Sequence, residues 1–90
     1  MKKPTWFVYI AICVDGTYYS GVTTDVHRRI NEHNSSAKGA RYTRSRRPTR
    51  LIYQEGAKNR SIASKREFAI KQMTRSQKER LVKATSPKIR

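Results

Sequence analysis

Two tyrosines, an arginine and a histidine near the start of the chain have the types and spacing to act on a phosphate. Tyr9 ends a strand-like segment, FVY, and Tyr19 opens another, YSG, ten residues later. A basic amphipathic helix pattern that carries Arg29 and His33 follows directly. These side chains offer several hydrogen-bond donors and no negative charge at neutral pH. The patch therefore favours a phosphate over a carbonyl or a sugar.

The polar pair on the helix is unusual because it interrupts an apolar stripe. Val26, Arg29, Ile30 and His33 fall at positions i, i+3, i+4 and i+7 of one helix face. Either polar residue alone is better explained structurally, with Arg29 reaching from the stripe edge into solvent and His33 hydrogen-bonded at the core boundary. Together they indicate a site, because their helix should lie over the sheet face that carries the tyrosines.

Glu67 is the acidic residue that could complete this site. It lies between Ala63 and Ile70 at the margin of an apolar helix stripe, in a chain with six acidic residues. A surface ion pair with Lys71 at i+4 is one explanation, and such a pair contributes a few tenths of a kcal/mol. The alternative is that Glu67 binds a hard divalent cation, with water and substrate phosphate oxygens completing the shell, as Mg²⁺ prefers.

A hairpin must position the tyrosines. Residues 6–14 are rich in aromatic and β-branched side chains and predict a strand buried on both faces, and residues 17–23 predict its return. A two-residue loop would pair Ile12 with Tyr19 and leave Tyr9 on the other face. A three-residue loop with left-handed Gly16 in a bulge pairs Ala11 with Tyr19, so both tyrosines share a face. We predict the bulged hairpin.

The remaining elements follow in a simple order. Asp25 is the predicted N-cap of the first helix, which ends at residues 34–36. Residues 37–50 are predicted to form a loop, and residues 51–53 a short third strand closed by Gly56. A helix opened by Asn59 or Ser61 runs to about Met73, and its predicted apolar stripe is Ile62, Ala69 and Met73. Thr74 and Gln77 form a capping box for a last helix that Pro87 ends. The fold class is α+β, with a three-stranded antiparallel sheet flanked by three helices.

Charge is the strongest compositional signal. Among 90 residues, 21 Lys and Arg stand against 6 Asp and Glu, giving a formal charge of +15. Solubility needs a net charge of only roughly 2 to 8, so this excess favours a polyanionic partner such as nucleic acid. The single cysteine, Cys13, excludes an internal disulfide and is predicted to be a buried thiol. The apolar run near the N-terminus is too short for a signal peptide or a membrane span, which predicts a cytoplasmic protein.

Several positions in this chain match one known set of motifs. They are Phe7-Val8-Tyr9, Tyr19-Ser20-Gly21, Arg29 eight residues after the motif glycine, His33, and Glu67 on a helix after the third strand. With them the chain resembles the GIY-YIG nuclease superfamily over nearly its whole length, most closely its small stand-alone bacterial members. Two positions depart from the usual pattern: Phe7 replaces a glycine and Ser20 replaces an aliphatic residue.

The resemblance implies a metal-assisted endonuclease, with DNA repair or recombination as its setting. It implies that Tyr9 or Tyr19 acts as general base or positions the attacking water, and that Arg29 binds phosphate oxygens. It further implies that Glu67 holds Mg²⁺ or Mn²⁺ and that His33 shuttles a proton or orients a phosphate. One domain would span residues 1–86, with residues 87–90 frayed.

The basic loop is the predicted DNA contact. It holds six cations and no acidic residue: Lys38, Arg41, Arg44, Arg46, Arg47 and Arg50. Charge runs are usually solvated surface, but six unneutralised cations beside a phosphate-directed face favour contact with the DNA backbone. Because no element looks suited to reading base edges, we expect structure-selective or non-specific cleavage of branched, nicked or single-stranded DNA.

Two other kinds of protein would share these features. One is a catalytically inactive nucleic-acid-binding module on the same scaffold, and the other is a basic RNA-associated protein that needs no metal. No small-molecule cofactor is expected, and the oligomeric state stays open.

Overall fold

The computed structural model describes residues 4–35 and 37–85. Along this part of the chain the elements are β1 (Trp6–Ile12), β2 (Tyr18–Thr23), α1 (Val26–Ser35), α2 (Arg41–Arg44), β3 (Arg50–Ala57), α3 (Arg60–Lys71) and α4 (Arg75–Thr85). The predicted α+β class and three-stranded antiparallel sheet are confirmed. The predicted frayed segment, residues 87–90, lies outside the described residues.

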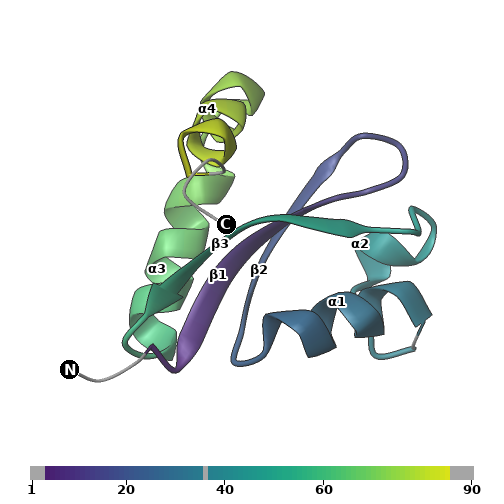
Figure 1. The fold of residues 1–90 in the computed structure, drawn as a ribbon, viewed down its shortest axis with the longest axis horizontal. Helices are drawn as coiled ribbons and strands as arrows, with labels where there is room; N and C mark the ends of the chain where they lie inside the picture. Colours follow the sequence, from purple (N-terminus) through teal and green to yellow (C-terminus); the bar gives the residue numbers. More distant parts are fainter. Residues whose placement is uncertain (1–3, 36, 86–90) are drawn as a thin grey trace.

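The sheet has the order β2-β1-β3, so β1 is central and β2 is an edge strand. Four consecutive β1 residues, Val8 to Ala11, are at most 1% exposed, as predicted for a strand buried on both faces. Figure 1 shows α3 and α4 on one side of the sheet and α1 and α2 on the other. The two faces of β1 therefore serve different purposes, one facing the core under α3 and the other facing α1.

The bulged hairpin is confirmed. Ala11 pairs with Tyr19, and Gly16 has a φ of 85° in the turn. The N–H of Cys13 donates to the Thr17 carbonyl at 2.8 Å, which closes the loop. Tyr9 and Tyr19 consequently share one face of the sheet, with their ring centroids 6.4 Å apart.

The predicted apolar stripe of α3 is wrong at Ile62 and Ala69, whereas Met73, just past the end of the helix, packs against the core as predicted. Ala63 and Ile70 are fully buried, whereas Ile62 is 45% exposed and Ala69 is exposed. Ala63 and Ile70 are two turns apart and share a face, and they pack with Val8 and Ile10 in the core. The small side chain of Ala63 suits close approach of the helix to the sheet.

The predicted basic loop contains a helix. Residues 41–44 form the single turn α2, which lacks a side-chain N-cap, so the sequence carries no local signal for it. The structure thus has four helices in its described part, where the sequence predicts three. The caps of the longer helices are confirmed: the side chain of Asp25 accepts from Arg28 N–H, and that of Asn59 accepts from Ile62 N–H.

The last helix begins at the predicted capping box. The Gln77 side chain accepts from the Thr74 N–H at 2.8 Å, and the Thr74 hydroxyl accepts from the Gln77 N–H at 3.1 Å. The predicted end at Pro87 lies outside the described residues. No helix in the described part of the chain is long and apolar enough to cross a membrane. Cys13 is a buried free thiol, as predicted.

Candidate functional site

The phenol of Tyr9 lies against strand β2 where that strand carries Gly21. The two residues are paired in the sheet, and a Cβ atom on Gly21 would lie 2.5 Å from the Tyr9 hydroxyl oxygen. Any side chain at position 21 would therefore displace the phenol. The glycine lets the Tyr9 hydroxyl lie over the edge strand, although Tyr9 as a whole is only 1% exposed.

His33 contacts the Tyr9 hydroxyl from α1. Its Nε2 atom is 2.7 Å from the phenol oxygen, and its Nδ1 atom accepts from the Ala40 N–H at 3.0 Å. The Thr43 hydroxyl, 3.3 Å from Nδ1, donates to the Ala40 carbonyl. Because a backbone N–H can only donate, Nδ1 carries a lone pair and the neutral ring carries its proton on Nε2. His33 therefore donates to Tyr9.

Gly39 makes this arrangement possible. A Cβ atom at position 39 would lie 2.5 Å from the Glu32 carbonyl oxygen and 2.8 Å from the Cα of His33. Only a glycine lets the chain run this close to α1, and the close approach brings the Ala40 N–H to the imidazole. The sequence analysis predicts a role for neither Gly39 nor Ala40. The signal available was a glycine inside an otherwise basic segment.

Charges from two helices act on the Tyr9 phenol. Burial raises its pKa well above the usual range, and the neighbouring Tyr19 adds to the rise. The Arg29 guanidinium opposes it through its charge and a hydrogen bond to the phenol, while the Glu67 carboxylate acts in the same direction as burial. Tyr19 lies beside the Tyr9 phenol, and Arg29 and Glu67 act on that phenol through their charges. That all four residues form one active site stays a prediction.

Arg29 is held in place on α1. Its Nη1 atom donates to Glu32 Oε1 at 2.8 Å and to the Lys38 carbonyl at 2.8 Å. The two N–H groups of this one nitrogen bridge helix and loop, and the guanidinium retains three further donors in its planar fork. The Glu32 contact also lowers the pKa of that carboxyl. This fixed cation beside a phenol can bind a phosphate oxygen.

Glu67 forms the surface ion pair that the structural explanation predicts. Its carboxylate lies 3.4 Å from the Lys71 ammonium, and the glutamate side chain is 21% exposed. Its charge nevertheless acts on Tyr9 across the sheet edge. Among the described residues no three His, Cys, Asp or Glu side chains lie together. A metal bound here would therefore have fewer than three ligands of these types from the described residues, and Glu67 is the predicted one.

Tyr19 belongs to an aromatic stack that the sequence did not predict. Its ring lies 5.9 Å from that of Tyr42 in a stacked arrangement, and the Arg46 guanidinium lies 4.0 Å from the Tyr42 ring centre. His33 meets the Tyr19 ring edge-on at 5.2 Å. The stack attaches the basic segment to the tyrosine face of the hairpin.

The six cations of the basic segment differ in their surroundings. Arg46 pairs with Asp15 at 3.1 Å, so the expectation that all six are unneutralised is wrong. Asp15 lies 31 residues earlier, in the hairpin turn, and only the fold brings it near. Arg47 donates to the His33 carbonyl and Arg44 to the Ala37 carbonyl. Lys38, Arg41 and Arg50 are exposed. DNA contact by the six stays a prediction.

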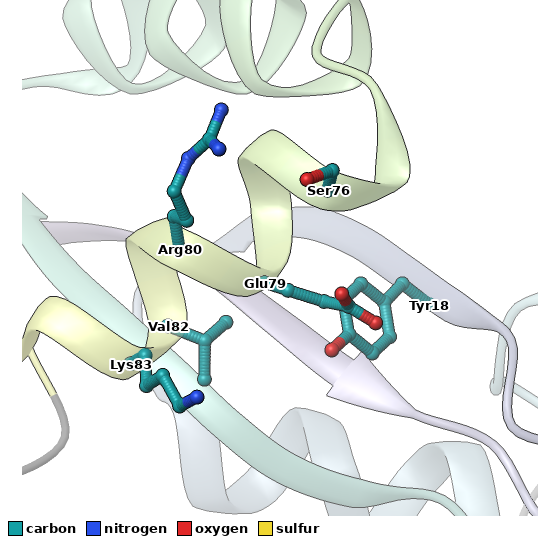
Figure 2. A pocket seen from close by; sticks show the side chains of 6 residues that line it. All are labelled: Tyr18, Ser76, Glu79, Arg80, Val82 and Lys83. Atoms are coloured by element: carbon teal, nitrogen blue, oxygen red, sulfur yellow. The ribbon is translucent and has the colours of Figure 1, made fainter.

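A recess between α4 and β2 lies outside this region (Figure 2). Its lining is Tyr18, Ser76, Glu79, Arg80, Val82 and Lys83. Arg75 lies 3.7 Å from the Tyr18 ring centre, pairs with Glu79 at 3.1 Å and donates to the Gly16 carbonyl at 2.9 Å. Tyr18 and Tyr19 are adjacent in a strand and point to opposite faces. The contacts around this recess therefore attach α4 to the hairpin.

The buried imidazole should make stability depend on pH. Burial, followed by the charge of Arg29, lowers the pKa of His33 to about 4. In the unfolded chain the His33 ring takes up a proton near pH 6.5. The contribution of neutral His33 to the free energy of unfolding is therefore fully present above pH 6.5 and is lost as the pH falls to about 4. This contribution is roughly 3 kcal/mol, at 1.36 kcal/mol per pKa unit.

Urea unfolding of the wild type between pH 8 and pH 4 should show this loss. The exposed His27 provides the matched variant: His27→Gln should retain the loss, and His33→Gln should reduce it. An NMR titration of the His33 ring checks the same pKa without any substitution. A ring that titrates near pH 6.5 would contradict the buried neutral imidazole.

Comparison with known families and proteins gives consistent matches. Residues 5–80 match the family described as the GIY-YIG catalytic domain. A UPF0213 protein of Desulfotalea psychrophila is 64% identical over 83 residues, which cover 92% of this chain and 76% of that protein. A UPF0213 protein of Halobacterium salinarum is 53% identical over 74 residues, covering 82% of this chain and 95% of that one.

Two solution NMR structures are also similar. The UPF0213 protein of Bacillus halodurans has a TM-score of 0.59 at 43% identity, covering 90% of this chain and 85% of that one. A protein of E. faecalis has a TM-score of 0.59 at 47% identity, covering 92% of this chain and 86% of that one.

Proposed function

The chain belongs to the GIY-YIG catalytic domain family, and on that premise we propose that it is a metal-dependent endonuclease that hydrolyses DNA phosphodiester bonds. The observation that carries the proposal is the surroundings of the Tyr9 hydroxyl. A neutral imidazole donates to it, and an arginine and a glutamate from different helices act on it. Hydrolysis of a phosphodiester uses such a set of groups: one that accepts the proton of the attacking water, a cation that binds the phosphate oxygens and a carboxylate that binds a metal.

The residues present fit a divalent ion of one kind. A single carboxylate with water and phosphate oxygens suits Mg²⁺ or Mn²⁺, because such ions keep several waters when protein-bound. Glu67 would hold the ion after releasing Lys71. When bound, the metal supplies positive charge that stabilises the departing 3′ oxygen.

In the proposed reaction, the side chains around Tyr9 act on the attacking water and its proton. A water oxygen bonds to phosphorus in line with the P–O3′ bond, which breaks. The Tyr9 phenol first releases its own proton to solvent, its ionised oxygen then takes the proton of the water, and solvent protonates the departing oxygen. The Nε2–H of His33 donates to the Tyr9 oxygen, and the positive charge of Arg29 lowers the pKa of Tyr9, so both favour its ionised form against the effect of burial. Tyr19 positions the water beside it.

The proposed substrates are branched, nicked or single-stranded DNA intermediates of repair and recombination. The exposed cations Lys38, Arg41 and Arg50 are suited to phosphates, which carry no sequence information. A net charge of +15 favours rapid, salt-dependent association with any such strand.

Arg29→Ala should slow cleavage by roughly 10²- to 10³-fold, as does removal of one donor to a developing negative charge. The assay is nicking of supercoiled plasmid and cleavage of flap, fork and single-stranded oligonucleotides with Mg²⁺ or with EDTA. Arg80→Ala, on exposed α4, is the matched control and should cleave normally. Cleavage by Arg29→Ala at the wild-type rate would indicate a contaminating nuclease.

One observation favours a catalytically inactive DNA-binding module. In the free protein the Tyr9 pKa is raised and Glu67 pairs with Lys71, so both reacting groups rest in an unreactive form. Tight DNA binding without cleavage over a range of Mg²⁺ and Mn²⁺ concentrations would support this function instead.

A further inference from the structure

A second recess, of about 350 Å³, adjoins Arg29 between the first turns of α1 and α3. Its lining includes Trp6, Thr24, Arg28, Arg29, Glu32 and Arg60. Arg29 therefore contributes both to this recess and to the surroundings of the Tyr9 hydroxyl. A DNA strand that places one phosphate at Arg29 has this recess next to it.

The recess is positively charged. Its single carboxylate, Glu32, is shared by Arg28 at 3.6 Å and Arg29 at 2.8 Å. Arg60 has no acidic partner within the described ranges 4–35 and 37–85. Three guanidinium groups against one carboxylate suit an anion, and their planar forks match phosphate geometry.

The position of Arg60 is costly for the helix that carries it. It is the first residue of α3, whose first turn contains no acidic side chain. The helix dipole disfavours a cation there by a few tenths of a kcal/mol. Its guanidinium lies 5.6 Å from the Trp6 ring centre, on an aromatic side chain that packs against the core. This cation–π contact leaves the N–H groups of Arg60 for a ligand.

Arg60 also has a defined distance from the metal ligand. It lies seven residues before Glu67 on the same helix, which corresponds to about 10 Å along the axis. With the two residues about two helix turns apart, Arg60 is placed to bind a neighbouring phosphate of the strand.

We propose that this recess is a flanking-phosphate subsite, in which Arg60, in cation–π contact with Trp6, binds the DNA strand beside the phosphodiester addressed by Arg29 and Glu67. The inference rests on the proposed function. The subsite implies that the substrate must have an extended strand that continues past the cut bond towards Arg60, at the start of α3.

Binding of fluorescein-labelled single-stranded oligonucleotides, measured by anisotropy in EDTA, tests the subsite without cleavage. Arg60→Gln should bind about tenfold more weakly than wild type, as expected for a lost charge-assisted hydrogen bond. The slope of log affinity against log salt should fall by about 0.7, the value for one phosphate on a single strand. Arg80→Gln removes the same charge from exposed α4 and should bind within twofold of wild type.

A scan with one neutral methylphosphonate linkage at a time locates the contact. One linkage should weaken binding by wild type and have no further effect on Arg60→Gln. Equal binding by Arg60→Gln and Arg80→Gln, or additive losses at every linkage, would overturn the subsite. If Arg60→Gln lowers binding but no protein preparation cleaves DNA, the nuclease proposal fails and the subsite stands. If the wild type cleaves DNA and Arg60→Gln binds it as tightly as the wild type does, the subsite fails and the nuclease proposal stands.

Discussion

Glu67→Gln is expected to lower metal-dependent cleavage by roughly 10³-fold or more, because it removes the carboxylate proposed to hold the ion. A bound metal supplies several kcal/mol of stabilisation to the departing oxygen, and each 1.36 kcal/mol changes the rate tenfold. Glutamine keeps the size of the side chain, and the lost ion pair with partly exposed Lys71 contributes little to folding. Melting temperature should therefore stay close to that of the wild type while cleavage disappears.

Lys71→Gln provides a control with the opposite sign. The lysine competes with the metal for the same carboxylate at 3.4 Å. A partly exposed pair of this kind contributes about 0.2–1 kcal/mol, so its removal should lower the Mg²⁺ concentration for half-maximal cleavage by a factor of about 1.4 to 5. Mg²⁺ titrations of cleavage by both variants give the comparison. Equal activity of Glu67→Gln and wild type at every Mg²⁺ concentration would exclude Glu67 as the metal ligand.

The features predicted correctly from sequence are those decided by residues close together in the chain. Asp25, Asn59 and Thr74 cap their helices with side chains that accept from the N–H three residues along, so the capping signal is local. The bulged hairpin likewise depends on one short turn around Gly16, and it decides that Tyr9 and Tyr19 share a face.

The features missed depend on contacts that the fold creates. The Ala40 N–H reaches His33 because Gly39 allows the chain to pass against α1, and a backbone donor has no sequence signature. Arg46 meets Asp15 across 31 residues for the same reason. The family motif directs attention to His33, but its proton position follows from the coordinates alone.

Tyr9→Phe is expected to slow cleavage by roughly 10²- to 10⁴-fold, the usual contribution of a positioned proton acceptor. The change removes one oxygen and leaves the ring over Gly21. It also leaves the buried Nε2–H of His33 without its partner at 2.7 Å, which should cost about 1–3 kcal/mol of folding stability. Single-turnover cleavage with saturating Mg²⁺, well below the melting temperature, separates the two effects.

Tyr53→Phe is the matched control for the loss of a buried phenol. Tyr53 is 4% exposed, lies in the core on the opposite face of the sheet and donates to Glu55. Its variant should lose stability and retain cleavage. Because the Tyr9 pKa is raised, wild-type cleavage should increase with pH up to at least pH 9, and Tyr9→Phe should lose this dependence. If Tyr19→Phe abolishes both the rate and its pH dependence while Tyr9→Phe retains them, the general base is Tyr19, and the His33 bond serves only to hold the strand and helix together.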